Sequence, residues 1–111
     1  MPARFRVEWT ESASTDFAEI VRYIARDSPA NARQVHLRIR KHVKTLTRFP
    51  GRGHTVPELI NLQLLSYREI SVPPFRIIYR IDKQKVFVIA VLDARRDIKQ
   101  VLAERLLRGK N

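Results

Sequence analysis

Arginines within an apolar stretch near the end of the sequence are the residues best placed to do chemistry. Arg76 and Arg80 lie four positions apart in FRIIYRI, so on a strand both point to one face. Arg95 and Arg96 directly follow the next apolar segment. Guanidinium groups gathered on one side of a sheet can bind phosphates or carboxylates through paired hydrogen bonds, which arginine makes better than lysine. As a group, these arginines predict a binding surface.

The same arginines could instead hold strands together. Arg76 and Arg80 each have an acidic residue within reach on a predicted strand, at Glu69 and Asp82, and a cross-strand ion pair contributes ~0.2 to 1 kcal/mol. For each arginine alone we favour this structural role. Only the four arginines considered together, with the net charge of the chain, favour a binding function.

Other reactive groups are few. The chain has no cysteine, which excludes disulfides and thiolate metal sites. Its three histidines, His36, His42 and His54, do not pair with each other or with a carboxylate at the spacing of metal ligands. The motifs GxSxG, GxGxxG and the P-loop are absent. We therefore predict no metal and no cofactor.

Charge is distributed unevenly along the chain. Its 111 residues include 22 Lys and Arg against 11 Asp and Glu, a formal net charge of +11 that favours nucleic acid or an acidic protein segment as partner. No acid occurs between Asp27 and Glu58. The basic residues in that interval are Arg33, Arg38, Arg40, Lys41, Lys44, Arg48 and Arg52. Such a run most often forms a solvated face, so charge alone does not make it a binding site.

The first half of the chain shows the periodicity of a strand and two helices. Residues 4–9 alternate as a half-buried strand, and a helix is predicted after the polar run 10–12, ending near Asp27. Ser28 is a cap residue, and Pro29 stands at the first position of a second helix that stops before Pro50. The two helices form a hairpin.

The second half changes to strand periodicity. An ordered loop is predicted for 51–62, followed by strands over 64–72, 73–82 and 86–94 and a helix over 97–107. Short connections make the three strands antiparallel neighbours. We predict one α+β domain over 1–111, with an N-terminal strand, a helical hairpin, a three-stranded antiparallel meander and a C-terminal helix. No secretory signal or bilayer-length apolar run is recognised, which predicts a cytoplasmic protein without a membrane partner.

The order of these elements resembles the ParE branch of the RelE/ParE superfamily of type II toxin-antitoxin toxins. The segments that carry the resemblance are SASTDFAEIVRYIARDSPANA, YREISVPPFRIIYRID and VFVIAVLDARRD, and the likeness covers residues 4–107. It implies a small basic bacterial toxin with a role in plasmid stabilisation. Its partner would be a ParD-like antitoxin whose acidic, apolar C-terminal segment wraps around it in a toxin-antitoxin hetero-oligomer.

The resembled superfamily divides by target. ParE-like members inhibit DNA gyrase by binding, which is the activity the resemblance implies. The alternative is a RelE-like endoribonuclease that cuts mRNA on the ribosome, with Arg76, Arg80 and Arg95 stabilising phosphate charge. In that comparison Arg76 matches the central-strand arginine, and Arg95 or Arg96 the arginine after the last strand. The Tyr or His that transfers protons in such nucleases has no counterpart after Asp93. General acid-base catalysis contributes ~10² to 10⁴ in rate. Its absence favours an inhibitor that acts by binding over an enzyme.

A small domain with this charge should bind an acidic amphipathic segment in a groove. The residues predicted to meet the antitoxin or the target are Arg38, Lys41, Arg48, Arg76, Arg80, Arg95 and Arg96. Ile20, Ile24 and Val35 are expected to serve mainly the core. A third interpretation is a nucleic-acid-binding module without toxicity, which salt-sensitive binding and normal growth on induction would support.

Overall fold

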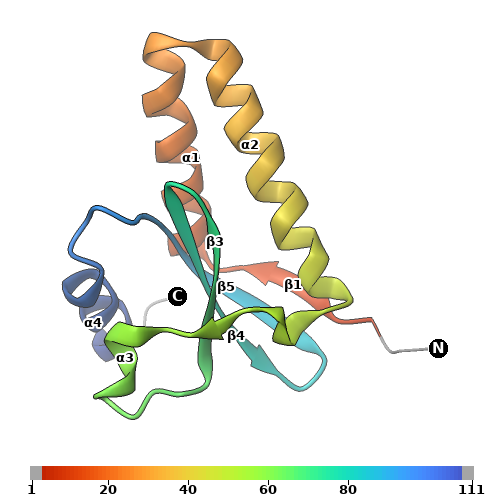
Figure 1. Cartoon of the computed structure of the whole chain (residues 1–111), viewed down its shortest axis with the longest axis vertical. Helices are drawn as coiled ribbons and strands as arrows, with labels where there is room; N and C mark the ends of the chain where they lie inside the picture. The colour runs from red at the N-terminus through yellow and green to blue at the C-terminus, as the bar shows by residue number, and fades with distance from the viewer. Residues whose placement is uncertain (1–3, 109–111) are drawn as a thin grey trace.

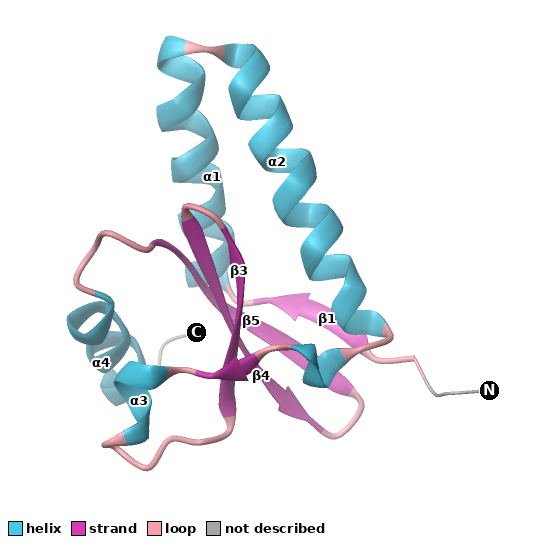
Figure 2. Cartoon of the chain, viewed as in Figure 1, coloured by secondary structure: helices cyan, strands magenta, loops and turns pink. Residues whose placement is uncertain are grey.

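Five strands form one sheet in the order β1-β5-β4-β3-β2 (Figures 1 and 2). They are β1 (Arg6–Trp9), β2 (His54–Thr55), β3 (Tyr67–Val72), β4 (Phe75–Asp82) and β5 (Lys85–Asp93). The structure is a computed structural model that describes residues 4–108, so both ends of the domain predicted for 1–111 lie outside it. The meander β3-β4-β5 is antiparallel as predicted, and β1 adds in parallel beside β5. The predicted α+β class and element order are confirmed.

The helices α1 (Glu11–Asp27) and α2 (Pro29–Lys44) form the predicted hairpin, which projects beyond the sheet at the top of Figure 1. Thr10 and Ser28 cap the two helices, because each side chain accepts a hydrogen bond from the backbone N–H three residues on, at 3.2 and 3.1 Å. A 3₁₀ turn, η1 (Thr45–Thr47), continues α2 before the chain reaches proline. Within residues 4–108, no helix has the length and apolar character needed to span a membrane.

Two apolar clusters fill the two faces of the sheet. Beneath the hairpin, Phe17 and Ile39 pack with Ile77 and Tyr79 of β4. On the opposite face Ile78 packs under two further helices, α3 (Pro57–Ile60) and α4 (Ile98–Arg108). The residues that join Ile78 there are Val56, Leu59, Ala90, Leu92, Ile98 and Leu102. Because side chains alternate along β4, its even-numbered residues all belong to the face that carries α3 and α4.

The segment predicted as a loop over 51–62 is more structured than predicted. It contains a 3₁₀ turn, η2 (Pro50–Arg52), then β2 and α3, so the loop prediction was wrong for most of it. The buried Tyr79 hydroxyl holds this segment to the sheet by donating to the Pro50 carbonyl oxygen at 2.6 Å and accepting the Gly53 N–H at 3.0 Å. Elements of two to four residues are too short to show a period, which is why the sequence pattern missed them.

Candidate partner-binding groove and the strand arginines

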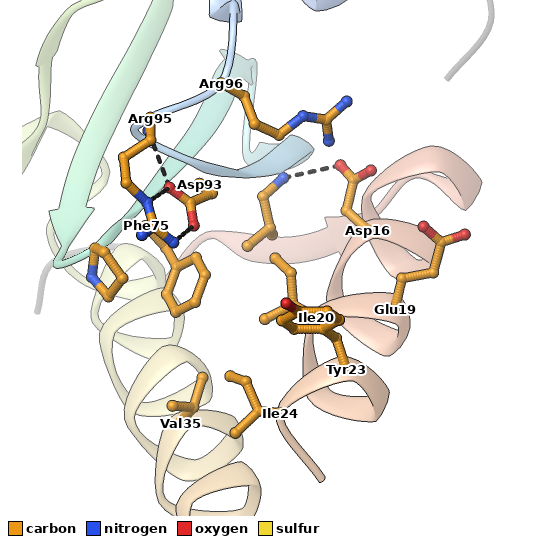
Figure 3. A pocket seen from close by; sticks show the side chains of 12 residues that line it. Asp16, Glu19, Ile20, Tyr23, Ile24, Val35, Phe75, Asp93, Arg95 and Arg96 are labelled. Carbon is orange, nitrogen blue, oxygen red and sulfur yellow. Dashed lines mark hydrogen bonds and ion pairs between the residues drawn. The ribbon is translucent and has the colours of Figure 1, made fainter. Parts of the chain in front are cut away.

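A groove opens between the helical hairpin and the end of the β4-β5 pair (Figure 3). We call it the hairpin groove; its volume is about 570 Å³. Apolar side chains from α1, α2, β4 and β5 line most of it, namely Ile20, Ile24, Val35, Phe75 and Val91. Three of these residues, Ile20, Ile24 and Val35, do pack against the core as predicted, but they also remain partly exposed in the groove. Their assignment mainly to the core was therefore incomplete.

Charged and aromatic residues border the hairpin groove on two sides. From α1 come Asp16, Glu19 and Tyr23, and Tyr23 is 69% exposed. From the end of β5 and the loop after it come Asp93, Arg95 and Arg96, and Figure 3 shows both arginines extending from this loop beside the groove. The groove therefore offers an apolar floor with a cationic border on the loop side and an acidic border on the α1 side.

Arg95 is tied to Asp93 at the open border of the groove. Its Nε and Nη2 donate to the two carboxylate oxygens at 2.9 and 2.7 Å, and its backbone N–H donates to Oδ1 at 2.9 Å. These hydrogen bonds lower the pKa of Asp93 to about 2. The Arg95 side chain is nevertheless 83% exposed, so its outer face stays open to a partner.

Asp16 has a structural role at the acidic border. Its carboxylate accepts the Val91 N–H at 3.0 Å and two hydrogen bonds from the Arg105 guanidinium, at 2.6 and 2.5 Å. Arg105 also donates to the Ile89 carbonyl oxygen at 3.2 Å, and its hydrogen bonds with Asp16 raise its pKa. This pair joins α4 to α1 and β5, so Asp16 is already satisfied and Glu19 is the freer acid beside the groove.

Arg76 lies on the opposite face of the sheet, between two carboxylates. Its Nε and Nη2 donate to Glu69 at 2.5 and 2.7 Å, and its Nη1 and Nη2 donate to Glu58 of α3 at 2.7 Å each. The Glu69 side chain is only 4% exposed and that of Arg76 16%. These hydrogen bonds, to Glu58 first, raise the pKa of Arg76 and lower that of Glu58. Arg76 is thus a mostly buried cation with four of its five N–H groups donated to carboxylates.

Arg80 shares this face with Arg76 but not its partners. Its guanidinium lies 4.9 Å from the centre of the Phe87 ring and 3.7 Å from an Asp82 oxygen. The cross-strand pair weighed from the sequence is observed between Arg76 of β4 and Glu69 of β3. Arg80 does pair with Asp82, but both residues lie on β4, so this ion pair does not join two strands. Sequence reasoning missed Glu58, because nothing in the pattern indicated that a one-turn helix would bring it back over β4.

The predicted binding residues occupy separate surfaces rather than one site. Arg38 reaches from α2 to the Pro73 carbonyl oxygen at 2.9 Å, whereas Lys41 faces a second groove beside β1. Arg48 is exposed after η1, and Arg95 and Arg96 border the hairpin groove. Within residues 4–108, no three His, Asp or Glu side chains gather as metal ligands would. The predicted binding residues are therefore spread over α2, the turn after it, the meander and the loop after β5.

Comparisons with known proteins agree with this fold. Residues 7–98 match the family profile described as "ParE toxin of type II toxin-antitoxin system, parDE". The chain is similar to a structure from P. aeruginosa described as a chromosomal ParDE toxin-antitoxin system, with TM-score 0.66 and 19% identity, covering 82% of this chain and 97% of that chain. It is also similar to the RelBE2 toxin-antitoxin complex from Mycobacterium tuberculosis, with TM-score 0.57 and 20% identity, covering 84% of this chain and 94% of that one.

A search of curated proteins found no match. The structural likenesses, both at or below 20% identity, show the shared fold. The family match extends over most of the chain, from β1 to the start of α4. This chain therefore belongs to the ParE toxin family of type II toxin-antitoxin systems.

Proposed function

We propose that this ParE-family toxin inhibits DNA gyrase and that a cognate ParD-like antitoxin neutralises it by binding the hairpin groove. The observation that carries the choice of target is the engagement of Arg76 by Glu58 and Glu69. An endoribonuclease would need this central-strand arginine free to bind phosphate. Here its donors face four carboxylate oxygens, and bound RNA would have to displace two negative charges.

The remaining features support inhibition by binding. Neither tyrosine nor histidine occurs after Asp93 to assist proton transfer. The cations that remain accessible, such as Arg95 and Arg96, border an apolar groove, which is typical of a protein-binding surface. Holding gyrase in a DNA-cleaved state requires contacts with protein and DNA and no chemistry from the toxin itself.

The hairpin groove supports the antitoxin part of the proposal. An amphipathic segment can place apolar side chains on Ile24, Val35 and Phe75 while its acidic side chains approach Arg95 and Arg96. The net charge of +11 would accelerate association with an acidic segment and make the rate fall as salt rises. The two structural relatives are described as toxin-antitoxin assemblies, which favours a partner of this kind.

The test is a gyrase assay with purified toxin. Increasing toxin is added to gyrase and relaxed plasmid, and supercoiling and the amount of cleaved plasmid after protein denaturation are measured. We expect supercoiling to stop and linear DNA to accumulate, and we expect prior addition of the antitoxin to prevent both. If supercoiling is unchanged at high molar excess and no cleavage complex forms, gyrase is not the target.

A RelE-like endoribonuclease remains the second candidate because of Arg80. Its side chain is 32% exposed, and Tyr67 lies directly opposite it on β3, so a tyrosine and an arginine share the same face. In a translating extract dosed with toxin, we expect intact mRNA. Cleavage that is lost in Arg80→Ala and in Tyr67→Phe would assign the nuclease activity instead. In cells, induction without antitoxin separates the two targets by whether DNA synthesis or translation stops first.

A further inference from the structure

The outer edge of β1 is unpaired. β1 is the last strand of the sheet (Figure 1), and the N–H groups of Arg6 and Thr10 donate inward to Gln84 and Val88 of the β5 side, at 2.9 and 3.1 Å. Alternation then points the N–H and C=O groups of Val7 and Trp9 away from β5. Within residues 4–108, these outward groups have no hydrogen-bond partner. β1 therefore presents two residues of open strand edge, a template for another strand.

A groove runs beside this edge, between β1 and the second half of α2. We call it the β1 groove; its volume is about 670 Å³. Its apolar lining consists of Phe5, Val7, Trp9, Leu37 and Val43. Leu37 is 54% exposed on α2, and Trp9 is fixed in place by stacking on Phe17 with the ring centres 5.2 Å apart. Leu37 is thus an apolar side chain without cover, next to unpaired backbone groups.

The charges around the β1 groove are all of one sign. Its charged lining residues are Arg6, Arg40, Lys41 and Lys44, and no acidic residue lines it. The hairpin groove differs in this respect, because Asp16, Glu19 and Asp93 stand beside its arginines. An occupant of the β1 groove would therefore gain from carrying carboxylates along with apolar side chains.

We propose that the β1 groove binds an extended, acidic and partly apolar segment of the antitoxin, which adds to the sheet as a further strand beside β1. The segment would hydrogen-bond with the outward backbone groups of Val7 and Trp9. Alternate side chains would cover Leu37, and its carboxylates would meet Lys41 and Lys44. This inference rests on the proposed function, since it names a second surface for the same partner.

Two other occupants fit the surface less well. A second copy of this chain could pair edge to edge through β1, but it would bring Lys41 and Lys44 of both copies together without an opposing acid. Nucleic acid would be attracted by the lysines, yet the outward carbonyl oxygens of Val7 and Trp9 would face its phosphates. Only a peptide strand supplies both donors and acceptors to the edge while covering the apolar lining.

The test is amide hydrogen exchange measured by NMR on the full-length toxin, free and in complex with the antitoxin encoded beside it. In the free toxin the amides of Glu8 and Thr10 should be protected and those of Val7 and Trp9 should exchange fast. In the complex we expect exchange at Val7 and Trp9 to slow at least about tenfold, with little change at Glu8. A complex that forms while Val7 and Trp9 keep their free rates overturns the inference but leaves the proposed function intact.

Two variants give an independent readout through antitoxin affinity. Val7→Pro removes an outward N–H, which an edge strand tolerates, and also replaces a side chain that packs against the core and lines the groove. Lys41→Glu combined with Lys44→Glu reverses the charge of the groove and leaves β1 unchanged. We expect each to weaken binding about tenfold or more while the thermal unfolding midpoint stays close to wild type. Arg33→Glu combined with Lys99→Glu, at two exposed positions outside both grooves, changes the net charge by the same amount and is the matched control for the charge reversal; it should bind much more tightly than the Lys41→Glu and Lys44→Glu variant. If Val7→Pro unfolds the toxin, the charge reversal alone decides.

The remaining outcomes are also decisive. Wild-type affinity in the charge-reversed variant overturns the inference. If the Val7 and Trp9 amides become protected only when DNA or RNA is added, the β1 groove binds nucleic acid and not the antitoxin. If their protection grows with toxin concentration alone, the groove binds a second copy of the toxin. Failure of the wild-type toxin to bind the antitoxin at all removes the antitoxin part of the proposed function, and with it this inference.

Discussion

Arg76 and Arg95 lie at the same end of the β4-β5 pair, on opposite faces of the sheet. Arg76 sits next to Phe75, whose register partner on β5 is Asp93, the carboxylate that holds Arg95. On the face under α3, Arg76 is buried between two carboxylates. On the hairpin face, Arg95 has one carboxylate and an exposed side chain. At this one end of the strand pair, the Arg76 side chain is 16% exposed and the Arg95 side chain is 83% exposed.

The difference shows what decides whether an arginine in this fold can bind a partner. Four of the five N–H donors of Arg76 are taken up by Glu58 and Glu69, and its side chain is 16% exposed. Arg95 keeps the outer side of its guanidinium free. The face under α3 should therefore govern stability, and the hairpin face should govern binding. Each of the following substitutions tests one side of this division.

Arg76→Met should give the largest loss of stability. It leaves the buried Glu69 carboxylate and the partly exposed Glu58 carboxylate next to each other without a cation. Removing one partner of a fully buried ion pair typically costs about 3 to 5 kcal/mol, and the partial exposure of Arg76 and Glu58 places the expected loss at the lower end of that range or below it. Urea unfolding at neutral pH measures the loss. Arg95→Met is the matched control on the open face, and its free energy of unfolding should stay close to that of the wild type because its pair is exposed.

A second variant separates lost charge pairing from lost packing. In Arg76→Met combined with Glu58→Gln and Glu69→Gln, the uncompensated carboxylates are gone, so much of the lost stability should return. No recovery in this triple variant would mean that the guanidinium stabilises the fold through its packing. An Arg76→Met loss no larger than that of Arg95→Met would show that the two faces do not differ.

Gly53→Ala should give the next largest loss of stability, because Gly53 positions the segment that carries Glu58. A Cβ there would lie 2.5 Å from both the Glu69 carbonyl oxygen and the Tyr79 hydroxyl, while φ is −78°, which any residue adopts. The obstacle is therefore contact and not backbone conformation. Forcing such a group into a packed site costs about 1 to 3 kcal/mol, again measured by urea unfolding.

Gly51→Ala provides the control for this glycine. A Cβ at Gly51 meets nothing within 4 Å, so the substitution should leave stability unchanged or slightly raised through a stiffer unfolded chain. Equal losses at Gly51 and Gly53 would contradict a role for close approach to Glu69 and Tyr79.

Tyr23→Ala should show the opposite behaviour on the hairpin face. Tyr23 is 69% exposed beside the hairpin groove, so the free energy of unfolding should change little. Exposed tyrosines that become buried in an interface are often hot spots, and we expect antitoxin affinity to fall by about 1 to 2 kcal/mol, measured by calorimetry. Phe49→Ala, at 65% exposure and outside both grooves, should not weaken binding. Equal losses from both substitutions would place the antitoxin elsewhere.

The hairpin and the meander could be predicted because their signals are local. Ser28 and Pro29 mark a helix start through capping and a fixed φ, and both are observed in these roles. The strand alternation of FRIIYRI correctly placed Arg76 and Arg80 on one face of the sheet. Local chemistry of this kind does not depend on what the rest of the chain does.

The features that escaped prediction depend on contacts between distant segments. β1 pairs with β5 across about three quarters of the chain, and a four-residue strand carries no mark of its neighbour. Glu58 reaches Arg76 only because the segment with Gly53 crosses the sheet. Likewise, a helical stripe predicts that Ile20, Ile24 and Val35 face inward, but it does not show that the sheet stops short of covering them. Both grooves arise from such incomplete covering.

Acid titration gives the smallest expected effect and distinguishes the two faces by their carboxylates. Hydrogen bonds from Arg95 hold the pKa of Asp93 at about 2, below its usual 3.8, and hydrogen bonds from Arg76 lower the pKa of Glu58 from its usual 4.5. A lowered pKa in the folded state stabilises the fold above the unfolded pKa. That contribution is lost as the pH falls through the folded value. The contribution of Asp93 to the free energy of unfolding should thus disappear between pH 4 and pH 2.

Arg95→Gln isolates the contribution of the Asp93–Arg95 pair to the pH dependence of stability. Without the guanidinium, the Asp93 midpoint in carboxyl-carbon NMR should rise from about 2 toward 3.8. It should stop short of 3.8, because the backbone N–H of residue 95 still donates to Asp93 and Arg96 is still near it. Because Arg95 is exposed, solvent and salt screen the pair, and acid unfolding should shift only slightly. Glu58→Gln should also flatten the acid dependence, because hydrogen bonds from Arg76 lower the pKa of Glu58 in the folded state. A large shift of acid unfolding in Arg95→Gln would mean that Arg95 stabilises the fold and is not held free for a partner.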